Sequence, residues 1–387
     1  MMKKTNKYTV CVKISLVLST LLFIGAAQST LGVNVLQPED SQTQKKDIQK
    51  GKFIAQEKAL QKAIQTSDVA VTNTVGVITN TVVDATTASI SHAVKKQNQS
   101  SNIISSGSNI NSNNGWNIQG NIFTANINQE SNEEIKKYKT GINGILFTVN
   151  KYLNKKAIIG VTGLYSNLNI QYDESINHIL NKTDCNAFSL SLNGRYYPQQ
   201  NIFTQGILGF IKYDGKTEYV ASQPSSEING NGYYGDFMLG WDLHPYSSKL
   251  TLSPIVGIRY STLKNASYKL FDGTTVGNAE HYLLEGRIGA TIKYIINNKS
   301  ISIMPELHAI VHRNLYTNSS NLKLEYPLLA NSGIVDIKTA SMPKLLGQLG
   351  GALTMQSGKI GFGLSYSAYL AANYIAHVGS INIKANF

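Results

Sequence analysis

Residues 374–387 read YIAHVGSINIKANF, and most apolar side chains of this stretch fall at every second position. The odd-numbered set from Ile375 to Phe387 is mainly apolar, whereas the even-numbered residues from Ser380 to Asn386 are polar. A period of two predicts a β-strand, because successive side chains point to opposite faces of an extended chain. Chain ends are usually polar and frayed. A strand that runs to a final phenylalanine therefore indicates a structural role for this end.

The first 27 residues have the pattern of a secretory signal peptide. Four lysines precede an apolar run, Ile14–Ala27, in which Gly25 and Ala27 supply the small residues of a cleavage site. The run has fourteen residues, whereas a helix that crosses a bilayer needs roughly twenty. A retained membrane anchor is the alternative. We predict residues 1–27 as a signal peptide and exclude them from the fold.

The composition argues against two classes of protein. Cys185 is the single cysteine after residue 27, so no intrachain disulfide can hold a small secreted scaffold together. The formal net charge is +12, of which the lysines of the signal peptide supply four charges. This balance suits an anionic membrane surface. The chain lacks the interleaved basic and aromatic clusters of nucleic-acid binders, so we predict no nucleic-acid partner.

Three segments separate the signal peptide from a uniform region that begins at Trp116. Residues 28–70 are polar and rich in helix-forming types, which predicts a short helical segment. Residues 71–97 carry almost no charge and are rich in valine, threonine and small residues. Residues 99–115 are mainly serine, asparagine and glycine, the composition of a linker.

The region from Trp116 onward reads as strands. Twelve are predicted, at residues 116–127, 139–150, 157–171, 185–197, 200–213, 230–243, 249–261, 281–295, 300–313, 343–356, 358–370 and 374–387. Most exceed the five or six residues that are usual in globular sheets. They are long enough for tilted strands that cross a bilayer, which need roughly nine to eleven residues in the hydrocarbon.

Each strand has one apolar and one polar face. In 281–295, for example, Leu284 and Ile288 belong to an apolar set, whereas Glu285 and Arg287 belong to the opposite set. Soluble β-sandwiches also alternate in this way. The alternation alone therefore leaves a soluble sandwich and a membrane barrel as alternatives.

The connections separate these alternatives, because their lengths alternate along the chain. Those after the second, fourth, sixth, eighth and tenth strands are short, whereas the others are long, up to about thirty residues between Asn314 and Met342. Tight turns on one side and large loops on the other are typical of a membrane barrel. We predict an all-β fold, a twelve-stranded antiparallel transmembrane β-barrel, with an N-terminal helical segment that threads or precedes it.

The polar faces would line the lumen of such a barrel. The predicted lumenal residues are Arg195, Asp236, Asp242, Arg259, Glu285, Arg287, Glu306, His308 and His312. We interpret them as a polar lining that packs around a helix; a selectivity or translocation path is the alternative. His308 and His312 are four residues apart, which on a strand is about 13 Å, too far for one metal ion. We predict no metal and no cofactor.

Several stretches, taken in order, resemble a known family. They are GINGILFTVNKYLNKKAIIGVTGLYSNLNIQY (141–172), AFSLSLNGRYYPQQNIFTQGILGFIKYDG (187–215), YYGDFMLGWDLHPYSSKLTLSPIVGIRYSTL (233–263), YLLEGRIGATIKY (282–294) and the terminal strand. In their spacing of glycine, aromatic and turn residues they resemble the translocator β-domain of classical autotransporters (type V secretion), of the rickettsial surface cell antigen kind. The resemblance covers residues 116–387.

The resemblance implies a monomeric outer-membrane barrel whose lumenal helix joins it to a passenger on the cell surface. Residues 71–115 would then hold the pore helix and linker, and residues 28–70 a short passenger-like segment. Family passengers are usually β-solenoids of hundreds of residues, and this chain departs from that pattern. The terminal strand would be read by the outer-membrane barrel assembly machinery, which pairs with its edge. The residues of this assembly signal would be Phe387, Ala385, Ile383 and Ile381.

The resemblance also marks Asn113 and Asn114 as a candidate passenger-cleavage point, with Glu285 or Glu306 as assisting carboxylates. The sequence shows no nucleophile elbow and no clear catalytic carboxylate pair, so we predict that the protein is not an enzyme. A barrel hydrolase is a third class that we keep only for completeness. The predicted function is an autotransporter barrel in the outer membrane that exports or displays its own N-terminal segment. A porin-like or adhesin barrel without a passenger, whose outer loops contact host surface molecules, is the alternative.

Overall fold

A computed structural model describes residues 40–98 and 115–387, except 155, 174–178, 221–222, 248, 299, 320, 327–333 and 339–342. The predicted signal peptide and the Asn113–Asn114 pair lie outside these residues. The chain divides into two compact units, Met1–Lys52 and Phe53–Phe387. Helical backbone from residue 40 onward is the described part of the first unit. The second unit contains the rest of the helix and all of the strands.

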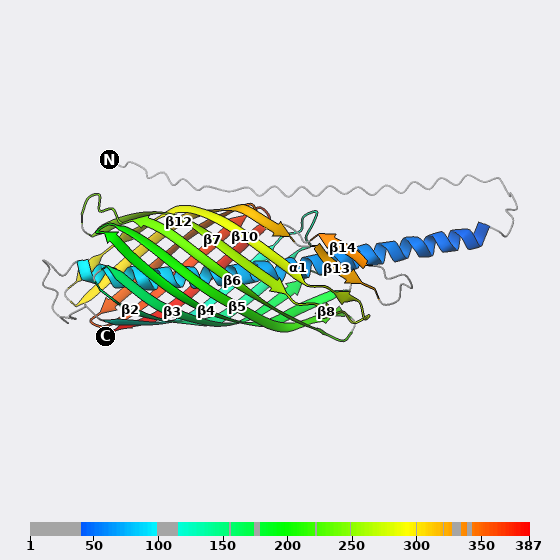
Figure 1. The fold of residues 1–387 in the computed structure, drawn as a ribbon, viewed down its shortest axis with the longest axis horizontal. Helices are drawn as coiled ribbons and strands as arrows, with labels where there is room; N and C mark the ends of the chain where they lie inside the picture. Colours follow the sequence, from blue (N-terminus) through cyan, green and yellow to red (C-terminus); the bar gives the residue numbers. More distant parts are fainter. Residues whose placement is uncertain are drawn as a thin grey trace, which may run out of the picture. The chain divides into compact units, whose positions relative to one another are not determined.

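Twelve long strands in the described residues of the second unit form one antiparallel sheet (Figure 1). They are β1 (Trp116–Gln129), β2 (Tyr138–Tyr152), β3 (Ala157–Tyr172), β4 (Leu180–Gln199), β5 (Ile202–Tyr219), β6 (Ser226–Trp241), β7 (Leu250–Asn265), β10 (Ala279–Tyr294), β12 (Ile301–Ser319), β15 (Leu345–Ser357), β16 (Ile360–Ala371) and β17 (Tyr374–Asn386). A three-residue strand, β11 (Ile296–Asn298), pairs with β12 in the turn that follows β10. The predicted fold class is confirmed.

The sheet closes where β1 pairs with β17, in a register that runs from Asn117↔Asn386 to Gln129↔Tyr374. Phe387 takes part, since its N–H donates to the carbonyl of Trp116 at 2.9 Å and its carbonyl accepts from the N–H of Trp116 at 3.0 Å. In the described part of the barrel sheet, closure leaves no edge strand without a partner, which is the condition for a sheet surrounded by hydrocarbon. The terminal strand is thus half of the barrel seam.

The strand ends differ from the prediction at the side of the long connections. The hairpin of β4 and β5 begins at Leu180 and extends to Tyr219, several residues beyond the predicted ends on that side. In this extension polar residues occupy the outward face, where Lys182 pairs with Asp184 and Glu218 at 2.9 and 3.2 Å. Strand pairing continues there although the outward face is no longer apolar, so the alternation of hydropathy gave no signal for it.

A second, four-stranded sheet was not predicted. It consists of β8 (Tyr268–Lys269), β9 (Thr275–Val276), β13 (Asn321–Glu325) and β14 (Ile334–Lys338), from the two connections after β7 and β12. Leu322, Leu324 and Val276 are buried and belong to the same apolar cluster as side chains of the helix and the barrel wall. Strands of two to five residues are too short to show a period in sequence.

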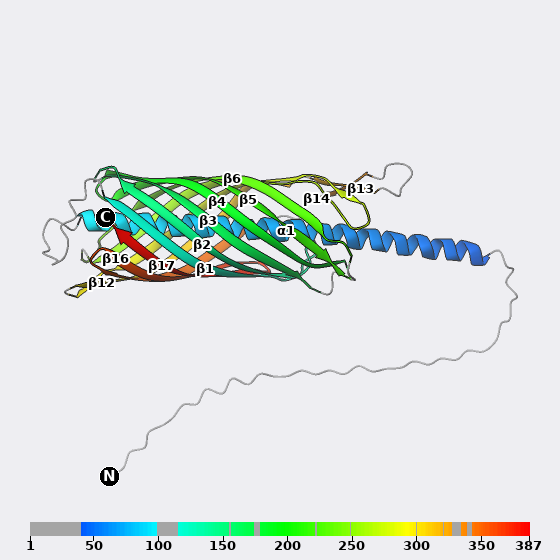
Figure 2. The same ribbon diagram turned by 90° about the horizontal axis from the view of Figure 1, so that it is seen from below.

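The part of the long helix α1 (Asp40–Asn98) that belongs to the second unit passes through the barrel, as both views show (Figures 1 and 2). It is continuous across residue 70, where the sequence analysis placed a boundary between two segments. Side chains described in 63–90 are mostly buried on every side of the helix. A helix that is enclosed on all sides has no reason to be amphipathic. This explains why the segment lacks a one-sided apolar stripe.

Threonine hydroxyls in the helix bond to the helix itself. Thr72, Thr74, Thr79 and Thr81 each donate to the carbonyl four residues earlier, at 2.6–3.0 Å. This pattern satisfies the hydroxyl and leaves the methyl group to pack against the wall. A valine- and threonine-rich sequence, only a fair helix former in water, is therefore well suited to a lumen.

Within the described residues, no helix combines the length and hydropathy needed to cross a membrane.

Substituting Leu208, whose side chain is 68% exposed on the outer face of β5, by arginine tests the orientation of the faces. We expect the free energy of unfolding in lipid vesicles to fall by about 2–4 kcal/mol, because a charge then faces the middle of the bilayer. Urea titration followed by tryptophan fluorescence measures this. Tyr246→Arg, in the exposed turn before β7, is the control and should leave stability unchanged. Equal stability of both variants would contradict a lipid-facing Leu208.

Candidate functional site: the lumenal helix and its contacts

The helix has a defined direction in the barrel. At the end of the long connections, the Lys62 Nζ donates to the carbonyl of Glu133 at 2.9 Å, in the connection between β1 and β2. At the end of the short turns, Ser89 donates to the Oδ1 of Asn117 at 3.1 Å and accepts from the Nδ2 of Asn150 at 2.8 Å. The helix therefore runs from the long-connection end to the short-turn end, where β1 begins.

The half of the lumen nearer the long connections is mainly apolar. Ile64, Val71 and Ile78 of the helix belong to one buried cluster with side chains of the wall. The wall members include Ile142, Leu168, Ile170, Tyr213 and Tyr234. Most of the apolar packing between helix and wall therefore lies in this half. A cavity of about 110 Å³ lies beside it, between residues 72–80 of the helix and the wall.

The other half is polar but mostly uncharged. Thr86 and Thr162 share a hydrogen bond at 3.1 Å, and the Nε2 of Gln205 donates to the Oγ1 of Thr87 at 2.6 Å. At Thr86 and Thr87 the helix is therefore held by neutral side chains.

Asp68 makes the first charged contact of the helix inside the lumen. Its Oδ1 accepts from the Nδ2 of Asn265 on β7 at 2.6 Å, and its Oδ2 lies 3.1 Å from the Nε2 of His281 on β10. Asp68 and His281 are both largely removed from solvent. A carboxylate in such a place needs partners of this kind.

Nine residues form a second and larger contact, which we call the helix clamp. They are Asn80 and Asp84 of the helix and Asp236, Arg259, Glu285, Arg287, His312, Gln348 and Tyr369 of the wall. The wall residues come from six strands: β6, β7, β10, β12, β15 and β16. The clamp therefore joins half of the barrel to two helical positions one turn apart.

The contacts of the clamp make a closed path. From Asp84, the Nε2 of Gln348 donates to Oδ2 at 2.8 Å, and the Oε1 of Gln348 lies 2.9 Å from the Nε2 of His312. The Nδ1 of His312 lies 2.9 Å from the Oε1 of Glu285, which lies 3.7 Å from the Nη1 of Arg259. Arg259 donates in turn to Asn80, which brings the path back to the helix one turn before Asp84. The hydroxyl of Tyr369 also donates to Asp84, at 2.6 Å.

Asp236 holds the arginines of the clamp. Its Oδ2 accepts from the Nε of Arg259 at 3.0 Å, and its Oδ1 accepts from Arg287. The side chain of Asp236 is fully buried. Removing one partner of a buried ion pair costs about 3–5 kcal/mol, because the other charge stays without compensation.

Apart from Asp242 and the two histidines, six of the nine predicted lumenal residues remain, and two of these lie apart from the clamp. Arg195 donates to the Oε1 of Gln205 at 2.6 and 3.0 Å, and its guanidinium lies 4.2 Å from the ring centroid of Phe203. Glu306 lies 2.9 Å from the Nζ of Lys293. The other four, Asp236, Arg259, Glu285 and Arg287, meet in the clamp, and all six side chains face the inside of the barrel.

Sequence reasoning missed the helical half of this site. Asp68 and Asp84 are the only charged residues in 63–90. Their isolation in a neutral segment was an available signal, because an ionisable residue in a buried helix needs a partner.

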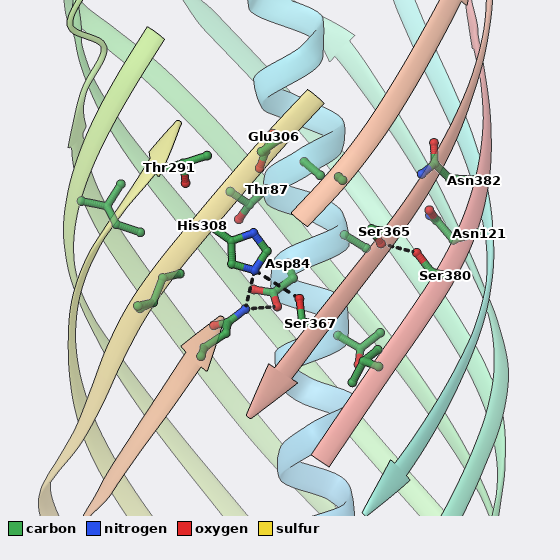
Figure 3. A pocket seen from close by; sticks show the side chains of 18 of the residues that line it. Asp84, Thr87, Asn121, Thr291, Glu306, His308, Ser365, Ser367, Ser380 and Asn382 are labelled. Atoms are coloured by element: carbon green, nitrogen blue, oxygen red, sulfur yellow. Dashed lines mark hydrogen bonds between the residues drawn. The ribbon is translucent and has the colours of Figure 1, made fainter. Parts of the chain in front are cut away.

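A cavity of about 140 Å³ lies beside the clamp, between the helix and the wall. Figure 3 shows His308 and Ser367 on the wall beside Asp84 of the helix. The Nε2 of His308 lies 3.2 Å from the Oγ of Ser367 and 3.3 Å from the Nε2 of Gln348. Such a polar space has room for water, which would bond to the groups that line it.

The predicted assembly-signal residues lie on the outer face of β17 and at its end. Ile381, Ile383 and Phe387 are exposed, and Ala385 is partly buried. Their even-numbered neighbours face the lumen, where Lys384 is buried.

Asp236→Asn tests the clamp. We expect a loss of about 3–5 kcal/mol in the free energy of unfolding, because two buried guanidiniums lose their shared carboxylate. Asp214→Asn, on the exposed outer face of β5, is the matched control, with an expected change within about 0.5 kcal/mol. Urea titration in vesicles gives both values. A barrel that tolerates both changes equally would show that the clamp contributes nothing to stability.

Comparison with known proteins assigns the family. The autotransporter beta-domain model matches residues 118–367. The chain is 24% identical over 281 residues to outer membrane protein A of Rickettsia conorii, an alignment that covers 68% of this chain and 14% of that protein. It is 25% identical over 289 residues to outer membrane protein B of Rickettsia rickettsii, covering 68% and 17%. The chain thus spans 12–17% of the length of these curated relatives.

Solved structures agree in fold. The translocator domain of the autotransporter NalP from Neisseria meningitidis superposes with a TM-score of 0.56 at 13% identity, covering 70% of this chain and 88% of that one. The beta domain of the Bordetella autotransporter BrkA gives 0.53 at 10% identity, covering 70% and 100%. The family model matches more than half of the chain. The chain belongs to the autotransporter β-domain family, and its twelve strands form an outer-membrane translocator barrel.

Proposed function

We propose that the barrel displays the segment that precedes its lumenal helix on the cell surface. The direction of the helix is the observation that carries this proposal. In outer-membrane barrels the short turns face the periplasm and the long loops face outward. Since Lys62 lies at the long-connection end and Ser89 at the short-turn end, the chain before residue 62 leads outward.

The proposed mechanism is physical and involves no catalysis by the barrel. Barrel closure satisfies the backbone, the outer apolar faces meet lipid, and the polar contacts of the lumen retain the helix after export. The exported segment would be the part of residues 28–70 that precedes Lys62, together with any passenger that it carries. Host surface molecules are candidate partners of the exposed loops and of this segment.

An epitope tag at residue 45 tests the direction of export. We expect protease added to intact cells to remove the tag, because the proposal places the chain before Lys62 outside. A tag inserted at residue 154, in the short turn between β2 and β3, is the control and should resist until the outer membrane is permeabilised. A tag at residue 45 that is equally protected would mean a barrel without an exported passenger, as in the porin-like alternative.

We further propose that the terminal strand is read by the outer-membrane barrel assembly machinery. Its outer face is apolar and its edge must stay open until it pairs with β1, so it is available to an assembling partner. Phe387 is the last contact of that edge.

Phe387→Ser should lower the amount of heat-modifiable barrel in outer membranes several-fold, because the machinery would lose its aromatic contact. Ile360→Ser, at an equally exposed position of β16, is the matched control and should assemble normally. Purified Phe387→Ser protein refolded in detergent separates recognition from stability, and we expect it to match the unaltered barrel there. Normal assembly of the Phe387 variant in cells would refute the signal.

A further inference from the structure

The lumenal helix carries little information about its own axial position. The hydroxyls of Thr72, Thr74, Thr79 and Thr81 bond within the helix. The methyl groups of threonine and valine have similar shapes, and both recur along the segment. If such a helix slides by one turn, it exchanges one set of small neutral side chains for another. Most of the surface of this helix therefore does not specify a register.

Neutral side chains of the helix also bond to the wall, as Asn73 does with Tyr138 and Ser67 with Tyr172. Asp68 and Asp84 are the only charged residues of 63–90. They are sixteen residues apart, which is about 24 Å along a helix, and each meets a matching set of wall residues. A shift of one turn in either direction would bring Ile64 or Thr72 to the level of Asp68. The same shift would bring Asn80 or Ala88 to the level of Asp84. Both charged contacts would be lost together.

Hydrogen-bond directions in the clamp bear on the charge of His312. The amide nitrogen of Gln348 donates to Asp84, so the amide oxygen faces the Nε2 of His312. The Nδ1 of His312 faces the carboxylate of Glu285. Both ring nitrogens face acceptors, an arrangement in which a doubly protonated ring would satisfy both contacts. The His308 Nε2 faces an amide N–H, which makes that nitrogen an acceptor.

Charge balance then depends on the helix. On the wall, Asp236 and Glu285 supply two negative charges, whereas Arg259 and Arg287, with His312 in its doubly protonated form, supply three positive charges. Asp84 of the helix supplies the third negative charge, and it interacts electrostatically with both arginines. With any other helical residue at this level, one buried positive charge would have no partner, which is strongly unfavourable.

We propose that Asp68 and Asp84 are positioning residues that stop the exported chain at one register, while the rest of the lumenal helix is a neutral surface that slides past the wall. The inference rests on the proposed export of the N-terminal segment. The wall recognises the stopping point by its uncompensated charge at the clamp and by His281 with Asn265. Export ends when both aspartates reach these sites.

Thiol crosslinking of the purified, refolded full-length chain tests this, with Cys11 and Cys185 first replaced by serine. The on-register reporter pairs Ser89→Cys with Asn150→Cys, which replace side chains in direct contact. The off-register reporter pairs Ala85→Cys with the same Asn150→Cys. Residue 85 can reach it only when the helix is displaced by one turn. We expect a short bifunctional thiol reagent to join the first pair and not the second.

Asp68→Asn with Asp84→Asn should lower the on-register yield several-fold and make the off-register product appear. Asp84→Glu made alone keeps the charge at residue 84, and it should give the on-register product. Thr86→Val is the matched control, since it removes one buried hydrogen bond to Thr162 without a change of charge, and it should stay on register. An unchanged, single register in the double variant would overturn the proposal.

A charge-shifted variant covers the case in which the neutral variant fails to fold. Ile64→Asp, Asp68→Asn, Asn80→Asp and Asp84→Asn together move both charges by one turn. The proposal expects the crosslink to move from residue 89 to residue 85, and a crosslink that stays at residue 89 would refute it. Since this measurement uses purified barrel and the surface-protease test uses cells, the failure of one is distinguishable from the failure of the other.

Discussion

The whole structure depends on the need to pair every backbone N–H and C=O of a sheet that is surrounded by hydrocarbon. Hydrocarbon offers no hydrogen-bond partner, so an open edge is not tolerated. The pairing of β1 with β17, down to the reciprocal bonds of Trp116 and Phe387, removes the last edge. This closure also creates the enclosed lumen, and the enclosed lumen determines which kind of helix can occupy it.

An enclosed helix has the opposite requirement to a surface helix. It has no solvent face on which to place charge, and its polar groups must be satisfied by itself or by the wall. Threonines that bond to their own backbone meet the first condition, and the clamp meets the second. The small side chains of the helix let the wall approach closely, and the few charged groups carry the specific contacts. Stability and position thus come from different residues.

Much of the barrel was predictable from sequence, because alternation with a period of two reports which face of each strand meets lipid. The sorted connection lengths also identified the membrane topology. The β4–β5 extension was missed because its outward residues are polar, so pairing persists where hydropathy is silent. Arg259 and Glu285 were predicted to face inward, but the partners of each could not be predicted. Those partners depend on the register of several strands at once, and Asp84 depends in addition on the axial position of the helix.

The seam between β1 and β17 has a topological consequence. Ser89 lies against Asn117 at the start of β1, so the helix reaches the barrel rim beside the seam itself. While the seam is open, a chain can enter the lumen from the side. Once residues 117–129 of β1 have paired with β17, the barrel encloses the helix. The helix then retains only movement along and about the barrel axis. Closing one pair of strands therefore limits the helix to movement along one axis when it finds its position in the lumen.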